Sequence, residues 1–203
     1  DATAFYEHTF PGEDHTIRFE FNIARSSDRE DNHYQNRYFY PGNNSTYDNT
    51  NIFQGDKQQQ LTIDYSHSIS ETVKLEAGYS GSFNHQDFNF YGEYFDFSFR
   101  SFVKDNIRSN QFLFNQSIHA LYGTYQKQYN KFGYSVGLRL EESIIKGYQV
   151  TKDTSINNNY LKLYPTVHFA YQLKESNELQ LNYSRRVHRP EGDDINPFPE
   201  YQD

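Results

Sequence analysis

Residues 16–25 read Thr-Ile-Arg-Phe-Glu-Phe-Asn-Ile-Ala-Arg, a stretch in which apolar and polar residues alternate. Its larger apolar residues all share one parity: Ile17, Phe19, Phe21 and Ile23. A period of two places the two sets of side chains on opposite faces of a β-strand. The stretch therefore predicts a strand with one apolar and one polar face.

The same alternation recurs along the chain. It is found at 61–66, 73–80, 112–122, 134–141, 165–173 and 179–188, with a partial further strand at 4–10. In the stretch 112–122 we assign five residues to the apolar face, with Gln116 as an exception: Phe112, Phe114, Ile118, Ala120 and Tyr122. Helical periodicity of useful length does not appear. The sequence therefore predicts an all-β fold of seven to eight antiparallel strands.

The predicted connections alternate between long and short. The long ones are 26–60, 81–111 and 146–160, and the short ones are 67–72, 127–131 and 174–178. Within the long ones, the stretch 88–102 also alternates, and the alternative is that such parts extend the strands beyond the bilayer. Up-and-down barrels of the outer membrane have this pattern, with short periplasmic turns and long external loops. The pattern therefore favours a transmembrane β-barrel whose long connections all lie outside the cell.

Composition excludes several classes of protein. The 203 residues include 19 Tyr and 18 Phe, and this aromatic content argues against disorder. The sequence has no apolar run of the roughly 18 residues that a transmembrane helix needs. A net charge of -8 argues against a nucleic-acid partner. Since cysteine is absent, disulfides and thiolate metal sites are excluded.

Strands with one apolar face fit two architectures. In a soluble sandwich the apolar faces form a core, whereas in a membrane barrel they meet lipid. Strands of about ten residues are long enough to cross a bilayer at a tilt. Aromatic residues near strand ends indicate a membrane girdle: Tyr65, Tyr79, Tyr122, Tyr129, Phe132, Tyr134, Tyr164 and Tyr183. We favour the barrel, and a soluble carbohydrate-binding module stays the alternative.

Three motifs in the second half of the chain are specific. They are Gly-Leu-Arg-Leu-Glu at 137–141, Tyr164-Pro165 at the start of a strand, and a longer block in 181–199. The block's key residues are Ser184, Arg185, Arg186, Arg189, Pro190, Asn196, Pro197 and Phe198. Together the motifs resemble the carboxy-terminal barrel of TonB-dependent outer-membrane receptors, in particular the outer-membrane β-barrel family common in Bacteroidetes.

The resemblance implies a 22-stranded barrel in the outer membrane of a Gram-negative bacterium, importing a bulky nutrient past a plug domain. Its implied partners are TonB with its inner-membrane complex, outer-membrane lipid and lipopolysaccharide, and a surface lipoprotein lid like that of related glycan importers. We find no plug and no TonB box. We therefore interpret residues 1–203 as an internal part of one barrel domain. A barrel without a transport function remains an alternative.

The polar faces supply candidate lumen residues. We expect contact with a plug or a substrate from Arg18, Glu20, Asp64, Lys74, Glu76, Arg139, Glu141, Arg186 and His188. The alternative is that these charges pair with one another along the wall.

A separate arginine cluster, Arg185, Arg186 and Arg189, is expected at a strand end near the external rim. It could bind the phosphates of lipopolysaccharide or of a substrate. The alternative is that loop carboxylates hold the cluster, the candidates being Glu191, Asp193 and Asp194.

Signals for catalysis are missing from the sequence. Neither a Gly-x-Ser-x-Gly motif nor a phosphate-binding glycine loop occurs. The eight histidines do not have the spacing of a metal site. We therefore expect no enzymatic activity, no cofactor and no metal.

Overall fold

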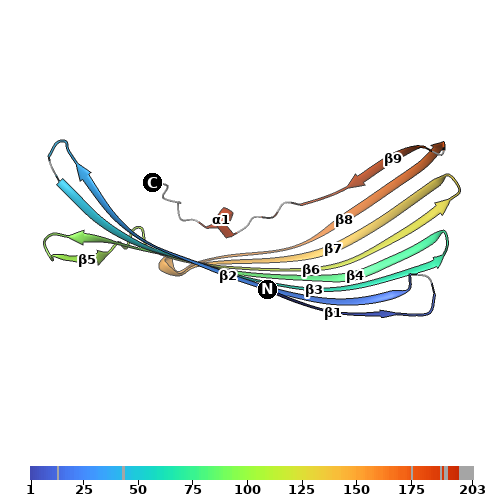
Figure 1. Ribbon diagram of the computed structural model, residues 1–203, viewed down its shortest axis with the longest axis horizontal. Coiled ribbons are helices and arrows are strands. Elements are labelled where there is room, and N and C mark those ends of the chain that lie inside the picture. Colours follow the sequence, from blue (N-terminus) through green and yellow to red (C-terminus); the bar gives the residue numbers. More distant parts are fainter. Residues whose placement is uncertain (13, 43, 175, 188, 190–191, 197–203) are drawn as a thin grey trace.

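The computed structural model describes residues 1–12, 14–42, 44–174, 176–187, 189 and 192–196. In this part of the chain one antiparallel sheet has the strand order β1-β2-β3-β4-β6-β7-β8-β9, with β5 paired to β4 (Figure 1). The strands are β1 (Ala2–Thr9), β2 (Thr16–Tyr38), β3 (Asn44–Ser70), β4 (Val73–Asp96), β5 (Ser101–Lys104), β6 (Asn110–Tyr129), β7 (Phe132–Gln149), β8 (Thr154–Lys174) and β9 (Asn177–Ser184). This confirms the all-β, up-and-down fold.

Most strands are longer than the sequence predicts. Because β2 continues to Tyr38 and β3 begins at Asn44, most of the predicted connection 26–60 is a paired hairpin. The connections 81–111 and 146–160 are likewise shortened by β4, β5, β6, β7 and β8. The prediction of long loops is wrong at these places, and the alternative of extended strands is confirmed within 88–102 by β4 and β5. In β2 the extension 26–38 carries polar residues at both parities, so its sequence lacks the alternation that marks a half-buried strand.

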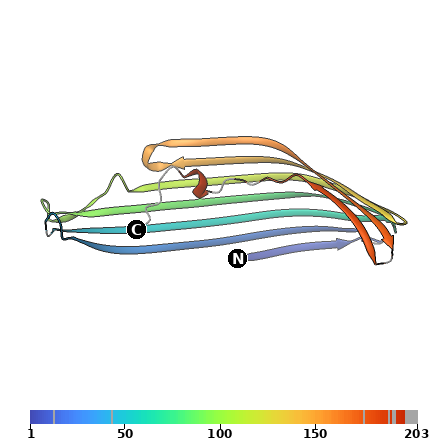
Figure 2. The same ribbon diagram turned by 90° about the horizontal axis from the view of Figure 1, so that it is seen from above.

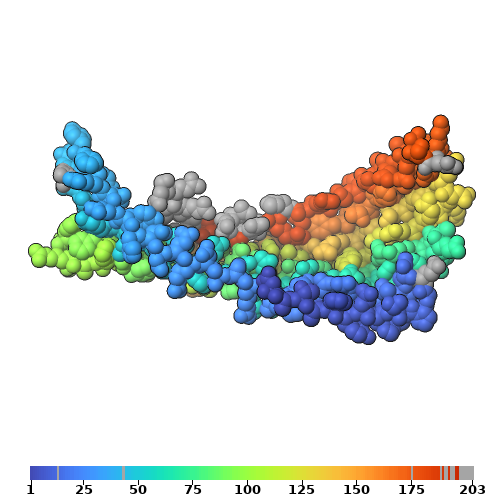
Figure 3. All heavy atoms as spheres, in the orientation of Figure 1, coloured from blue at the N-terminus to red at the C-terminus, as the bar shows by residue number. Residues whose placement is uncertain are grey.

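The sheet curves into a trough (Figures 1 and 3). The long hairpins, including the β2–β3 tip and β5, project at one end, and the short turns lie at the other. Asn130, in the turn between β6 and β7, has a positive φ of 41°. Asparagine tolerates this left-handed conformation, which a tight hairpin turn requires.

The pairing register fixes which residues share a face, since directly opposed residues point to the same side. One row crosses the convex face: Phe19, Ile63, Tyr79, Leu121, Leu140 and Leu163. The adjacent row crosses the concave face: Arg18, Asp64, Gly78, Tyr122, Arg139 and Tyr164. Leu121 is 61% exposed and Leu163 is 45% exposed. The apolar face is therefore the outer one, where a barrel meets lipid.

The five residues assigned to one face in 112–122 share a face as predicted, but that face does not meet lipid. The register places Phe112, Phe114, Ile118, Ala120 and Tyr122 on the concave face. Phe112 and Phe114 are 1% exposed and form a small core with Ile145, against which Phe88, Tyr160 and Ile195 pack. Apart from Leu113, the outer face of β6 is polar near its start, with Gln111, Asn115 and Ser117. This part of β6 therefore has its apolar side inward, the reverse of the pattern near the short turns.

The chain leaves the sheet after β9 and enters the trough (Figure 2). There α1 (Gly192–Ile195) lies over the concave face. Gly192 packs against Gln86 and Phe88 of β4, so a Cβ there would displace the end of the Gln86 side chain, and the Ile195 side chain lies near Gly147 of β7. In the described part of the chain, no helix has the length and hydrophobicity needed to cross a membrane.

Candidate functional site

A buried carboxylate lies at the centre of the concave face. The side chain of Glu141 on β7 is 4% exposed, and Arg139, two residues earlier on the same face, donates from Nε to Glu141 Oε2 at 3.0 Å. Arg189, from the segment after β9, forms an ion pair with the other carboxylate oxygen. We call these three residues the Glu141 cluster. Burying a carboxylate is costly unless it is paired, and two guanidinium groups meet that requirement here.

A tyrosine connects this cluster to the neighbouring strands. The Arg139 guanidinium lies over the Tyr122 ring, 5.6 Å from its centroid, and the Tyr122 hydroxyl donates to Asp64 on β3. Tyr122 reaches across β4 because it lies over Gly78, where a Cβ would come within 2.5 Å of the tyrosine oxygen. A glycine in a strand interior often marks such a close approach. The contacts therefore join β3, β6 and β7 and the segment after β9.

A cavity of about 320 Å³ adjoins the cluster. Its walls include Tyr122, Thr124, Gly137, Tyr164, Arg185 and Arg186. The buried hydroxyl groups of Tyr164 and Ser143 have no hydrogen-bond partner among the described residues. Buried polar groups are normally satisfied by protein or water. The concave face therefore has unused hydrogen-bonding capacity next to a group of arginines.

The other predicted lumen charges also lie on the concave face, and they pair locally. Arg18 contacts Glu20 at 2.6 Å and Glu7 at 3.6 Å, and Lys74 contacts Glu76 at 2.9 Å. Each of these basic residues contacts the acid two residues later on its own strand, as Arg139 does. The predicted residues of β2, β3, β4 and β7 thus share one face, and their roles as ligand or plug contacts stay predictions.

The arginine cluster is not at the external rim. Since β9 ends at Ser184, opposite Thr166, Arg185 and Arg186 line the cavity inside the trough. Their side chains make no ion pair within the described residues, whereas Arg189 contacts Glu141. The predicted rim position is wrong because the chain turns inward instead of extending β9.

Several motif and loop residues are not described. His188, Pro190, Glu191, Pro197 and Phe198 lie outside the described residues, as do the side chains of Asp193 and Asp194. The hypothesis that loop carboxylates hold the arginines therefore stays a prediction. Asn196 is described, and its backbone N–H donates to the Gly192 carbonyl at 2.9 Å.

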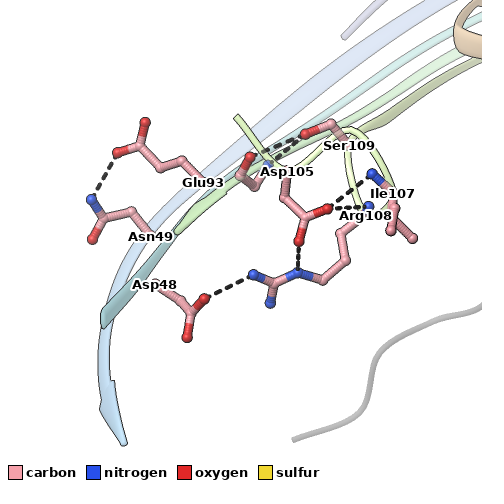
Figure 4. A network of polar contacts seen from close by, with 8 residues as sticks. Asp48, Asn49, Glu93, Asp105, Ile107, Arg108 and Ser109 are labelled. Carbon is pink, nitrogen blue, oxygen red and sulfur yellow. Dashed lines mark hydrogen bonds and ion pairs between the residues drawn. The ribbon is translucent and has the colours of Figure 1, made fainter. Parts of the chain in front are cut away.

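A second polar network lies at the external end of the sheet (Figure 4). Arg108 contacts Asp48 of β3 at 2.9 Å and Asp105 at 2.7 Å. Asp105 also accepts hydrogen bonds from the backbone N–H groups of Ile107 and Arg108. Partial burial opposes ionisation of Asp105, but the bonds from Arg108 and the two backbone groups outweigh it and lower its pKa. These contacts fix the β5–β6 connection to β3.

In the described ranges no three His, Cys, Asp or Glu side chains gather as a metal site. His15 and His67 stack with ring centroids 4.0 Å apart, and the Tyr65 hydroxyl lies near both rings. These residues share the outer face near the short turns.

The model of the outer membrane protein beta-barrel family matches residues 8–203. The chain belongs to this family. Members of an outer-membrane barrel family are placed in the outer membrane, and the convex apolar face agrees with that location. The soluble carbohydrate-binding module is therefore wrong.

Solved structures support the barrel fold. The crystal structure of the ferric citrate transporter FecA in its unliganded form is similar, with a TM-score of 0.58 and 13% sequence identity. The match covers 89% of this chain and 26% of the FecA chain, so this family member corresponds to about a quarter of that transporter. A sequence comparison with curated proteins finds no significant match.

Sequence reasoning missed two residues of the site. Tyr122 and Tyr164 were assigned to the membrane girdle, but both lie on the concave face, Tyr164 directly opposite Arg139. The signal was available for Tyr164, because it has the parity opposite to that of Pro165 and Val167 on its strand. For Tyr122 the sequence contained no such signal, because the other apolar residues of 112–122 have the same parity and indicate an apolar face.

Proposed function

We propose that this chain forms part of the barrel wall of a TonB-dependent receptor that imports a bulky nutrient through a barrel closed by a plug. The observation that carries the proposal is the concave face, where the buried Glu141 carboxylate, the unpartnered Tyr164 hydroxyl and a cavity of about 320 Å³ occur together. A purely structural wall has no need of buried groups without partners. Similarity to the fold of a ferric citrate transporter supports the same function.

In this proposal Arg185 and Arg186 contact the plug or the substrate. Glu141 is already neutralised by Arg139 and Arg189, so it does not supply a free negative charge. Guanidinium groups bind carboxylates and phosphates in a bidentate manner, and the nearby Tyr164 hydroxyl offers a further hydrogen bond. An acidic group of the plug or of the substrate fits this pair.

The proposal also assigns partners. TonB and its inner-membrane complex supply energy through the plug, and a surface lipoprotein lid covers the external hairpins. The protein has neither an enzymatic activity nor a bound cofactor in this proposal.

Growth experiments test the function. A strain lacking the full-length gene is grown on single-nutrient media to find the nutrient whose uptake needs it, and the same media are repeated in a strain without functional TonB. We expect both strains to fail on the same nutrient. Replacing Arg185 and Arg186 by Gln should reduce uptake of that nutrient at least tenfold, with an unchanged amount of protein in the outer membrane.

The matched control removes two positive charges elsewhere, with Lys131→Gln and Lys174→Gln at the short turns. This control should transport normally. Growth that needs the gene but not TonB would exclude energy-coupled import.

One observation favours a barrel that binds without transporting. The tips of the long hairpins expose large apolar side chains: Phe39 at 78%, Tyr40 at 90%, Phe99 at 77% and Ile107 at 80%. Exposed apolar groups of this kind often mark binding surfaces. A deletion strain that grows normally on every nutrient but loses surface binding would support this second function.

A further inference from the structure

Two histidines and a tyrosine bring three donor atoms together on the outer face near the short turns. Tyr65 Oη lies 3.1 Å from His15 Nε2 and 3.3 Å from His67 Nδ1. The register that places Thr16 opposite Ser66, continued by one residue, places His15 opposite His67, and the two rings stack with centroids 4.0 Å apart. We call His15, Tyr65 and His67 the outer histidine site. The pairing of β2 with β3 therefore gathers two imidazole nitrogens and one phenol oxygen.

The separation of these donors fits a tetrahedral metal ion. Zn²⁺ binds imidazole nitrogen and protein oxygen at about 2.0–2.2 Å, so two ligands of a tetrahedral ion lie about 3.3–3.5 Å apart. The two distances from the Tyr65 oxygen, 3.1 and 3.3 Å, are close to that separation. Because the rings are stacked, each must turn about its Cβ–Cγ bond to direct its nitrogen lone pair at a shared ion. This torsion is broad in histidine, so the rotation costs little.

The β1–β2 turn fixes the backbone at His15. The Phe10 N–H donates to the His15 carbonyl at 2.8 Å, and the rings of Phe10 and His15 have centroids 4.5 Å apart. The Asp14 carboxylate accepts a hydrogen bond from the Ser68 hydroxyl, which ties the turn to β3 next to His67. Only the imidazole rings therefore need to move when an ion binds.

The outer histidine site lies at the edge of the apolar band. On β2 the next outward residue after His15 is Ile17, and on β3 the outward residue before Tyr65 and His67 is Ile63. The three side chains of the site are half-buried. Because short turns of outer-membrane barrels lie on the periplasmic side, an ion in the periplasm reaches the site without crossing lipid.

Spacing along the chain does not reveal this site. Metal sites are recognised in sequences by ligands a few residues apart, and on that basis the sequence predicts no metal. His15 and His67 are far apart in the sequence and meet only because β2 pairs with β3.

We propose that the outer histidine site binds a divalent transition-metal ion, with Zn²⁺ as the ion that fits it. His15 Nε2, His67 Nδ1 and the Tyr65 oxygen are three ligands, and water takes the fourth position. Imidazole nitrogen is a common ligand of Zn²⁺. The bound ion ties the β1–β2 turn to β3. The proposal does not depend on transport, because the site lies on the face opposite to the Glu141 cluster.

Zinc titration of the full-length barrel tests the site. The protein is purified in detergent without a polyhistidine tag, treated with a chelator and titrated with zinc chloride in a calorimeter. We expect the double variant His15→Gln/His67→Gln to bind one Zn²⁺ fewer than the unaltered protein. Tyr65→Phe should weaken binding about tenfold or more, since even a group that only hydrogen-bonds to a metal ligand changes metal affinity by about 10- to 100-fold. Co²⁺ in place of Zn²⁺ should give the intense visible absorption of a tetrahedral ion, and the double variant should lose it.

The control variant His33→Gln/His85→Gln removes two histidines elsewhere, one on β2 and one on β4, and should bind both ions like the unaltered protein. A heat-dependent band shift on SDS gels verifies that each variant forms a closed barrel. Equal Zn²⁺ stoichiometry in the unaltered protein and the double variant would overturn the proposal, as would unchanged affinity in Tyr65→Phe. An equal loss of Zn²⁺ in the control variant would also overturn it, because the protein would then bind an adventitious ion only.

Discussion

An arginine placed on the outer face of β7 should destabilise the barrel, whereas an arginine one residue away should not. Val136 is 46% exposed on the convex face, and Ser135 lies on the concave face. The outward apolar part of β7 extends from Phe132 to Leu140, with Glu142 as the next outward residue. Val136 is therefore close to the middle of the apolar band.

The depth of Val136 in the bilayer sets the expected loss of stability. An arginine facing lipid at the bilayer midplane costs about 2–4 kcal/mol, which is about a 30- to 700-fold change in the folding equilibrium. Phe132 is four residues from Val136, about 13 Å along the strand and about 10 Å along the membrane normal. Near the interface the cost falls to about 0–1 kcal/mol. We expect Val136→Arg to cost clearly more than Phe132→Arg.

The concave control has room for the new side chain. Ser135 borders a hollow of about 380 Å³ that is also lined by Lys74, Gln126 and His168. We expect Ser135→Arg to change stability by less than about 0.5 kcal/mol, as for most exposed sites.

Denaturant titration of the full-length barrel in phospholipid vesicles measures all three variants. Equal costs at Ser135 and Val136, or a larger cost at Phe132 than at Val136, would refute the assignment of faces.

Three further predictions concern packing and the external network. Gly78→Ala should cost about 1–3 kcal/mol because its Cβ would overlap Tyr122, whereas Gly123→Ala, whose Cβ would meet only an atom 3.7 Å away, should be nearly neutral in the same titration. Arg108→Ala should increase the mobility of a nitroxide attached at Ile107→Cys, because the connection then loses both ion pairs; an unchanged spectrum would contradict this role. The pKa of Asp105 is lowered, so its stabilising contribution is complete above the usual value of 3.8 and is lost as the pH falls below it; the same label should become mobile only in that acidic range, and a transition near neutral pH would contradict the assignment.

The sequence predicted the fold where one face meets lipid and the other meets water. In β2 and β7 this contrast holds over about ten residues, and the parity of Phe19 and Val136 was assigned correctly. The assignment of faces failed for the parts of the strands that lie beyond the bilayer. There water covers the outer face of the barrel and α1 covers the inside of the trough. The apolar side chains of Phe112 and Phe114 therefore point inward and pack against protein. Alternation reports which face is drier, and it does not report whether lipid or protein covers that face.

The candidate site was predictable in part. Residues two apart on a β-strand point to the same face, so the proximity of Arg139 and Glu141 could be predicted from the sequence. The contact between Glu141 and Arg189 could not, because it depends on the chain leaving the sheet after Ser184. Local patterns contain no information about such a departure.

The unbroken register of the β2–β3 hairpin restricts how this arm can change during evolution. From Thr16 opposite Ser66 to Tyr38 opposite Asn44, every residue has a single partner. An insertion of one residue in either arm would turn every side chain beyond it to the other face. Changes in length are therefore tolerated at the tip, residues 39–43, or as matched additions to both arms. Epitope tags and natural length variants should follow the same parity.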